Sequence, residues 1–103
     1  MNIPGSVRIG SMDYKIKVSD EMILVNHTEC YGSIDFRTKI IRINNEAQSI
    51  QGQEETLLHE IFHGICEERN FTYLGNDDET ITEELARGLH QLIRDNTGMF
   101  VKS

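Results

Sequence analysis

The chain has few cysteines and no long apolar run. Two cysteines, Cys30 and Cys66, are too few for a disulfide framework, so a reducing cytoplasm is the simplest compartment to expect. The amino-terminal segment has no apolar stretch after a basic start, and no other apolar run approaches the length that spans a bilayer. The sequence therefore predicts neither a secretory signal nor a membrane partner.

Basic residues are scarce in one half of the chain only. Residues 1–50 hold six basic and six acidic side chains, whereas residues 51–103 hold four basic and eleven acidic ones. The whole net charge of −7 therefore lies in the second half. An acidic half repels a phosphate backbone, which argues against nucleic acid as a partner, and it favours a cation. Solvated helix faces are the alternative explanation for most of these carboxylates.

The first half of the chain predicts strands. Apolar and polar residues alternate over residues 12–18, with residues 6–10 as the expected hairpin partner. The same alternation recurs over residues 31–36 and 39–44, which a short turn joins into a second hairpin. The apolar run at residues 22–25 fits a strand or a helical turn equally well.

The second half predicts two helices. Apolar residues recur at helical spacing over about residues 53–68 and 79–95, and a polar segment separates the two patterns. Strands followed by helices indicate an α+β domain, in which an antiparallel sheet carries both helices on one face. A chain of 103 residues has room for one core, so residues 1–103 are expected to form a single domain. Gly64 and Gly88, inside these helices, favour a close approach of one helix to the other.

The stretch LLHEIFHG, residues 57–64, contains the clearest chemical motif. His59 and His63 are four residues apart, so on a helix both imidazoles lie on one face, where neutral ring nitrogens can bind one zinc ion. Glu60 projects to one flank, where its carboxylate can take a proton from a metal-bound water. Coincidence is the alternative, but these polar side chains would be costly to bury in an apolar helix without partners. The motif is the HExxH pattern of zinc hydrolases.

A catalytic zinc site needs a third protein ligand, and the segment TEELARGL offers two carboxylates. The longer pattern HExxHxxGxxH fails here, because Cys66 and Arg69 occupy the positions of its glycine and last histidine. Glu83 and Glu84 are the candidates, and helical periodicity does not choose between them. A cap is the alternative role for Glu83, because Thr80-x-x-Glu83 fits a capping box.

In these motifs and in its order of elements, the chain resembles small phage-type zincin metallopeptidases, near the ImmA/IrrE-like families. There, strands precede an HExxH helix, and a later helix supplies a glutamate ligand in an E-x-x-A-[N/D] pattern. The stretch EELAR matches with Glu83 first and Ala86 fourth. Arg87 departs from the pattern, because an arginine cannot accept a hydrogen bond from a histidine ligand as Asn or Asp does. Asp77, Asp78 and Glu79 are the acidic residues that could take over that task.

The resemblance implies a minimal zincin fold and a Zn²⁺ ion held by His59, His63 and Glu83. Glu60 would be the catalytic base of a hydrolase that cleaves a peptide or protein in the cytoplasm of a bacterial host cell. His90, seven residues after Glu83, is a candidate for stabilising the oxyanion of the transition state, and an exposed histidine without a role is the alternative. An edge strand, either 31–36 or 39–44, would receive extended peptide beside the active helix.

The rival hypothesis is a non-catalytic, zinc-containing phage accessory protein that binds a host protein. A chain of 103 residues leaves little surface for substrate pockets, and Arg87 weakens the catalytic case. A fourth protein ligand, with Cys66 as the candidate, would favour this hypothesis, because a closed coordination sphere has no position for substrate. The sequence specifies neither the substrate nor the oligomeric state.

Overall fold

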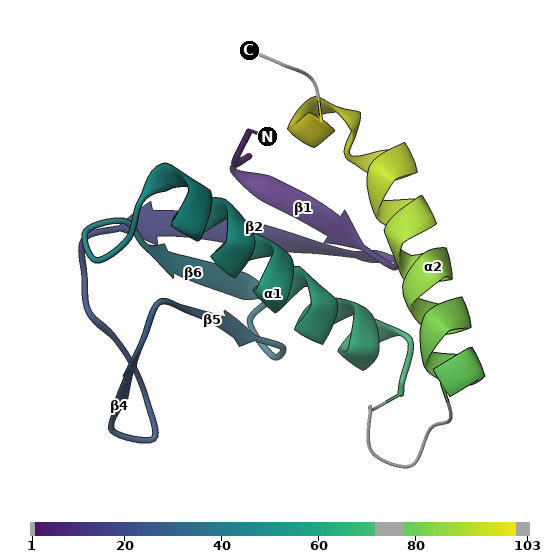
Figure 1. The fold of residues 1–103 in the computed structure, drawn as a ribbon, viewed down its shortest axis with the longest axis horizontal. Coiled ribbons are helices and arrows are strands. Elements are labelled where there is room, and N and C mark those ends of the chain that lie inside the picture. Colours follow the sequence, from purple (N-terminus) through teal and green to yellow (C-terminus); the bar gives the residue numbers. More distant parts are fainter. Residues whose placement is uncertain (1, 72–77, 101–103) are drawn as a thin grey trace.

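The computed structural model describes residues 2–71 and 78–100. In chain order the elements are β1 (Ser6–Ile9), β2 (Met12–Ser19), β3 (Ile23–Val25), β4 (Thr28–Cys30), β5 (Gly32–Asp35), β6 (Ile40–Asn44), α1 (Ile50–Glu68), α2 (Asp78–Asp95) and the short 3-10 helix η1 (Thr97–Phe100). The strands come first and the two long helices follow (Figure 1). The α+β class that the sequence predicts is confirmed.

The main sheet has four strands in the order β1-β2-β6-β5. Both predicted hairpins are present, since β1 pairs with β2 and β5 with β6 in antiparallel register. The prediction of a wholly antiparallel sheet is wrong, because β2 and β6 run parallel. After β2 the chain forms the separate β3–β4 hairpin and returns through β5, so β6 enters the sheet beside β2 in the same direction. The segment 39–44 is therefore central, and β5 is the edge strand.

The apolar run at residues 22–25 contributes a strand. Its residues form β3, which pairs with β4 through a two-residue turn. Asn26 and His27 occupy that turn with φ of 52° and 65°, the left-handed conformation that tight hairpin turns require. This hairpin stands apart from the main sheet and leads directly into β5 (Figure 1).

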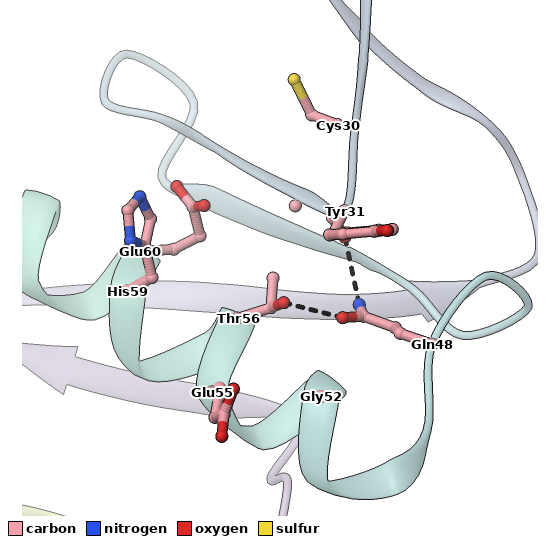
Figure 2. A pocket seen from close by; sticks show the side chains of 9 residues that line it. Cys30, Tyr31, Gln48, Gly52, Glu55, Thr56, His59 and Glu60 are labelled. Carbon is pink, nitrogen blue, oxygen red and sulfur yellow. Dashed lines mark hydrogen bonds between the residues drawn. The ribbon is translucent and has the colours of Figure 1, made fainter.

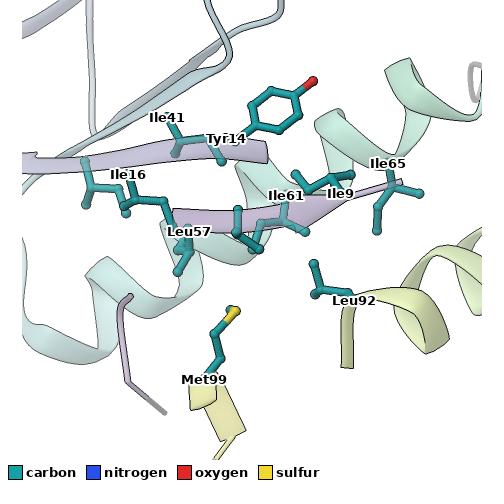
Figure 3. Close-up of a cluster of buried hydrophobic side chains, with 11 residues drawn as sticks. Ile9, Tyr14, Ile16, Ile41, Leu57, Ile61, Ile65, Leu92 and Met99 are labelled. Atoms are coloured by element: carbon teal, nitrogen blue, oxygen red, sulfur yellow. The ribbon is translucent and has the colours of Figure 1, made fainter. Parts of the chain in front are cut away.

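One hydrophobic core joins the sheet to both helices (Figure 3). The buried set comprises Val7, Ile9, Tyr14, Ile16, Ile41, Ile43, Leu57, Ile61, Ile65, Leu92 and Met99. Helix α1 lies across one face of the sheet. Helix α2 lies beside the carboxyl-terminal half of α1 (Figure 1). Three residues of the predicted apolar stripes, Phe62, Leu89 and Ile93, are more than a third exposed. Each helix buries only the turns that contact the sheet or the other helix.

Helix α1 begins at Ile50, three residues earlier than the sequence pattern indicates. The side-chain oxygen of Ser49 accepts a hydrogen bond from the backbone N–H of Gly52 at 3.1 Å, and this N-cap starts the helix before its first apolar turn. Among the described residues, no helix has both the length and the apolar character needed to cross a membrane.

The two glycines inside the helices have different neighbours. A Cβ atom on Gly88 would lie 2.5 Å from Ile65 Cγ2, so this glycine allows α2 to approach α1, as predicted. A Cβ atom on Gly64 would instead lie 2.8 Å from Ile9 Cδ1, so Gly64 allows α1 to approach the sheet. An ion pair between Arg69 and Glu84 also joins the two helices.

Candidate active site

His59 and His63 meet on the exposed side of α1, as their four-residue spacing predicts. Their Nε2 atoms are 3.1 Å apart, and the two rings are arranged edge to face with centroids 4.7 Å apart. At this distance two neutral imidazoles can share one N–H···N hydrogen bond. They can also bind a single ion, because two zinc–nitrogen bonds of about 2.0–2.1 Å together exceed the separation of the two atoms. The donor set therefore suits zinc.

Glu60 is a buried residue, with only 8% of its surface exposed. Its carboxylate has no hydrogen-bond or ion-pair partner within the described part of the chain, yet no side-chain oxygen there is both buried and unpartnered, so the carboxylate oxygens reach the solvent of the groove that Glu60 lines. Burial raises the pKa of Glu60, and the nearby imidazoles of His59 and His63 offset part of that rise. A carboxylate with raised proton affinity, next to two potential metal ligands, has the properties of a general base.

A groove of about 540 Å³ opens beside the motif, and Glu60 and His59 line one end of it (Figure 2). Its helical wall consists of Gly52, Glu55, Thr56 and His59, which recur at the spacing of one α-helical face. The opposite wall is the segment 30–32, where the chain passes from the β3–β4 hairpin into the edge strand β5. The HExxH face therefore borders the free edge of the sheet.

Gly32, the first residue of β5, sets the distance between the edge strand and α1. A Cβ atom at this position would lie 2.4 Å from Thr56 Cγ2 and 3.4 Å from Glu60 Oε2. Any larger residue would push the strand away from the base. Gly32 is not among the residues predicted from the sequence, although a single glycine inside a strand pattern is a known sign of close backbone approach.

A hydrogen-bond network fixes the other end of the groove. Gln48 Nε2 donates to the carbonyl oxygens of Asn44 at 2.8 Å and Tyr31 at 3.4 Å. Gln48 Oε1 accepts from Thr56 Oγ1 at 2.9 Å, as the dashed lines of Figure 2 show. The amide thus connects the end of β6, the start of β5 and α1. No local sequence motif marks these residues, because the contacts join segments distant along the chain.

Glu83, the expected third ligand, is more than half exposed on α2 and forms an ion pair with Arg87, one helical turn away. Within residues 2–71 and 78–100, no group of three or more His, Cys, Asp or Glu side chains is placed to hold a metal ion. The structure therefore brings His59 and His63 together but does not add Glu83 to them. Helix α2 begins at Asp78, so Thr80 lies inside the helix and the capping-box alternative for Glu83 is wrong.

Glu84, the other candidate, is engaged with two cations. Its carboxylate accepts from Arg69 Nε at 2.5 Å and lies 3.7 Å from Arg87 Nη1. The hydrogen bond from Arg69 lowers the pKa of Glu84. Glu84 therefore joins α2 to the end of α1, whereas the partner of Glu83 among the described residues is Arg87 on its own helix, in a surface ion pair.

His90, Cys66 and Glu79 are not among the residues that line the groove. His90 is exposed on α2, and no hydrogen bond or ring contact among the described residues joins it to His59 or His63. Cys66 is a partly buried residue of α1 that is not among the residues lining the groove. Glu79 is exposed. Asp77 and the side chain of Asp78 lie outside the described residues.

No protein family, no curated protein and no solved structure matches this chain. The residues and their arrangement are therefore the whole basis of the functional proposal.

Proposed function

We propose that the protein is a zinc-dependent, metallopeptidase-like hydrolase of the zincin type. One observation supports the proposal: Glu60 is 8% exposed, has no ion-pair partner among the described residues, and opens its carboxylate to a groove beside two imidazoles whose Nε2 atoms are 3.1 Å apart. Neither an apolar core nor a solvated helix face explains that combination. A mostly buried glutamate with a raised pKa, in a groove beside two potential metal ligands, is typical of functional sites.

His59, His63 and Glu83 are the proposed zinc ligands. A zinc ion held there would polarise a peptide carbonyl and supply a nucleophile from water near neutral pH. To bind zinc, the Glu83 carboxylate would have to give up its ion pair with Arg87. Exposed ion pairs of this kind typically contribute about 0–1 kcal/mol, so breaking the pair with Arg87 is not costly.

Glu60 is the proposed general base. Its carboxylate takes a proton from the attacking water, and the resulting acid returns that proton to the nitrogen of the leaving amine. The burial that raises the pKa of Glu60 favours the first step, because the group binds the proton more readily than an exposed carboxylate. His90 stays a candidate for stabilising the oxyanion, which would require α2 or the substrate to bring it closer.

The edge strand β5 is the proposed platform for an extended peptide. It ends the sheet on the side of the groove, and its first residue, Gly32, lies against Glu60. A peptide that pairs with this edge would gain main-chain hydrogen bonds and would present successive carbonyls along the groove. The substrate class is accordingly a peptide or an extended segment of a protein.

The proposal is tested with zinc-loaded wild-type protein and two variants of α1, assayed on a diverse peptide library. Glu60→Gln should retain zinc and lower turnover by about 10²–10⁴-fold, since that is the typical contribution of a general base. Glu67→Gln, an exposed glutamate of the same helix outside the groove, should leave turnover unchanged. Full turnover by zinc-loaded Glu60→Gln would rule out the proposed mechanism.

A second candidate function is a zinc-containing protein that binds a host protein without cleaving it. The engagement of Arg87 with both Glu83 and Glu84 favours it, because neither carboxylate is then free to complete an open zinc site. This candidate predicts that Glu60→Gln retains the full biological activity of the wild type.

A further inference from the structure

The groove beside the HExxH face has a fixed shape and a definite charge. Its helical wall presents Glu55 one turn before His59, about 6 Å along the helix axis. At the closed end, Gly32 lies too near Thr56 and Glu60 for a side chain to pass between strand and helix. A substrate side chain that enters beside Glu60 must therefore run along α1 towards Glu55.

Most polar groups of the lining are already hydrogen-bonded. Cys30 Sγ donates to the Thr28 carbonyl oxygen at 3.4 Å. Gln48 Nε2 donates to the Asn44 carbonyl oxygen at 2.8 Å, and Gln48 Oε1 accepts from Thr56 Oγ1 at 2.9 Å. These groups shape the groove but have little capacity left for a charged ligand.

Glu55 is different, because no described residue forms a hydrogen bond or ion pair with its carboxylate. Among the described residues, the lining contains no lysine or arginine, and its other carboxylate is Glu60. The exposed Tyr31 adds an aromatic ring to the opposite wall, and such rings attract cations. Both the free charge and the ring therefore complement a cation.

We propose that the groove binds an arginine or lysine side chain of the substrate, next to the attacked peptide bond, with Glu55 as the residue that selects it. This inference rests on the proposed function, because it assigns the groove to a substrate peptide. A neutral or apolar side chain would leave the Glu55 carboxylate unpaired and would gain no electrostatic attraction. Glu55 is a specificity-determining residue in this account, and the base remains Glu60.

The test compares two blocked amino acids of nearly equal shape, Nα-acetyl-arginine amide and its neutral counterpart Nα-acetyl-citrulline amide. Their binding to the full chain is followed by NMR through the amide signals of Gly32 and Gly52, on opposite walls of the groove. We expect the arginine compound to bind about two- to fivefold more tightly, the range for an exposed ion pair. The preference should shrink from about 0.01 M to about 1 M salt, over which the Debye length falls from roughly 30 to 3 Å.

Matched variants separate the groove from the helix and from catalysis. Glu55→Gln should abolish the preference for arginine, while Glu67→Gln, on the same helix outside the groove, should keep it. Equal binding of the two compounds to the wild type, or an unchanged preference in Glu55→Gln, would overturn the assignment of Glu55.

The same samples distinguish failure of this inference from failure of the proposed function. If Glu60→Gln stops peptide cleavage but the wild type binds both compounds equally, the proposed hydrolysis is supported and the preference of the groove for a basic side chain is excluded. If the arginine preference depends on Glu55 but zinc-loaded protein cleaves no peptide, the groove assignment stands and hydrolysis is excluded.

Discussion

At the scale of single residues, Glu60 links stability to function. Its pKa is raised from the usual 4.5, so the folded state binds this proton more tightly than the unfolded state does. Ionisation of Glu60 therefore destabilises the fold, and this cost grows as the pH rises from 4.5 through the raised pKa. The ionised form of Glu60 is therefore the form that destabilises the folded protein.

Glu60→Gln should accordingly stabilise the metal-free protein. We expect a gain on the order of 1 kcal/mol at pH 7, because the uncompensated charge is removed while a polar group of similar shape remains. The gain should vanish below about pH 4, where both forms are neutral. Urea denaturation of chelator-treated protein at the two pH values measures it. A Glu60→Gln protein less stable than the wild type at pH 7 would mean that the carboxylate has a stabilising partner.

Tyr14 forms the second buried polar cluster, with Glu68 and Lys39, at the other end of α1. Its hydroxyl donates to Glu68 Oε2 at 2.6 Å, and Lys39 Nζ donates to the same oxygen at 2.8 Å. Burial and the hydrogen bond to Glu68 raise the pKa of Tyr14 to about 12. Burial alone would raise the pKa of Glu68, but the hydrogen bonds from Lys39 and Tyr14 lower it. The cluster ties β2, the β5–β6 turn and α1 together.

Tyr14→Phe should lower the free energy of unfolding by about 1.5–3 kcal/mol, the typical value of a hydrogen bond to a charged group. Because the folded-state pKa is raised, this stabilisation is complete below pH 10 and is lost as the pH rises from 10 to about 12. Denaturation at pH 8 and near pH 12 checks both statements. Tyr31→Phe, at an exposed tyrosine, is the control and should change little. A pH-independent loss would contradict the assigned role of the hydroxyl.

At the scale of elements, the crossing of α1 and α2 depends on Gly88. Gly88→Ala should destabilise the fold by about 1–3 kcal/mol, since the new methyl group would overlap Ile65. Helix propensity alone predicts the opposite sign, a gain of roughly 1 kcal/mol. Gly98→Ala is a matched control, because no atom lies within 4 Å of its added Cβ. Thermal denaturation should show that Gly88→Ala lowers the stability less in an Ile65→Ala background than in the wild type. Equal losses of stability in the two backgrounds would mean that the added methyl group does not clash with Ile65.

Local sequence patterns predicted the elements better than their arrangement. Alternation predicted both hairpins, because hairpin partners are neighbours in the chain. The parallel pairing of β2 with β6 was missed, because it joins segments that the β3–β4 hairpin separates. The start of α1 was missed because Ser49 caps the helix before its apolar pattern begins. Local signals specify an element, and tertiary packing decides its partner.

At the scale of the whole molecule, the difference between local signals and tertiary packing also explains which parts of the candidate site could be predicted from the sequence. His59 and His63 were predicted because a helix fixes the spacing of residues four apart. The groove was not predicted, because its walls come from α1 and from the chain between β4 and β5. The choice between Glu83 and Glu84 depends on how α2 sits against α1. In the structure, Arg69 and Arg87 hold those carboxylates.

The most direct test of the central claim is the zinc content of the purified protein, measured by mass spectrometry after dialysis without chelator. The account predicts about one zinc per chain, as a catalytic site with three protein ligands requires. The His59→Ala variant, the His63→Ala variant and the double variant with both substitutions should each lose the bound zinc. Glu83→Ala should weaken binding by at least roughly 10–100-fold, the range known for outer-shell partners of metal ligands, and Glu84→Ala should not. A wild type without zinc, or full zinc retention in the double histidine variant, would contradict the account.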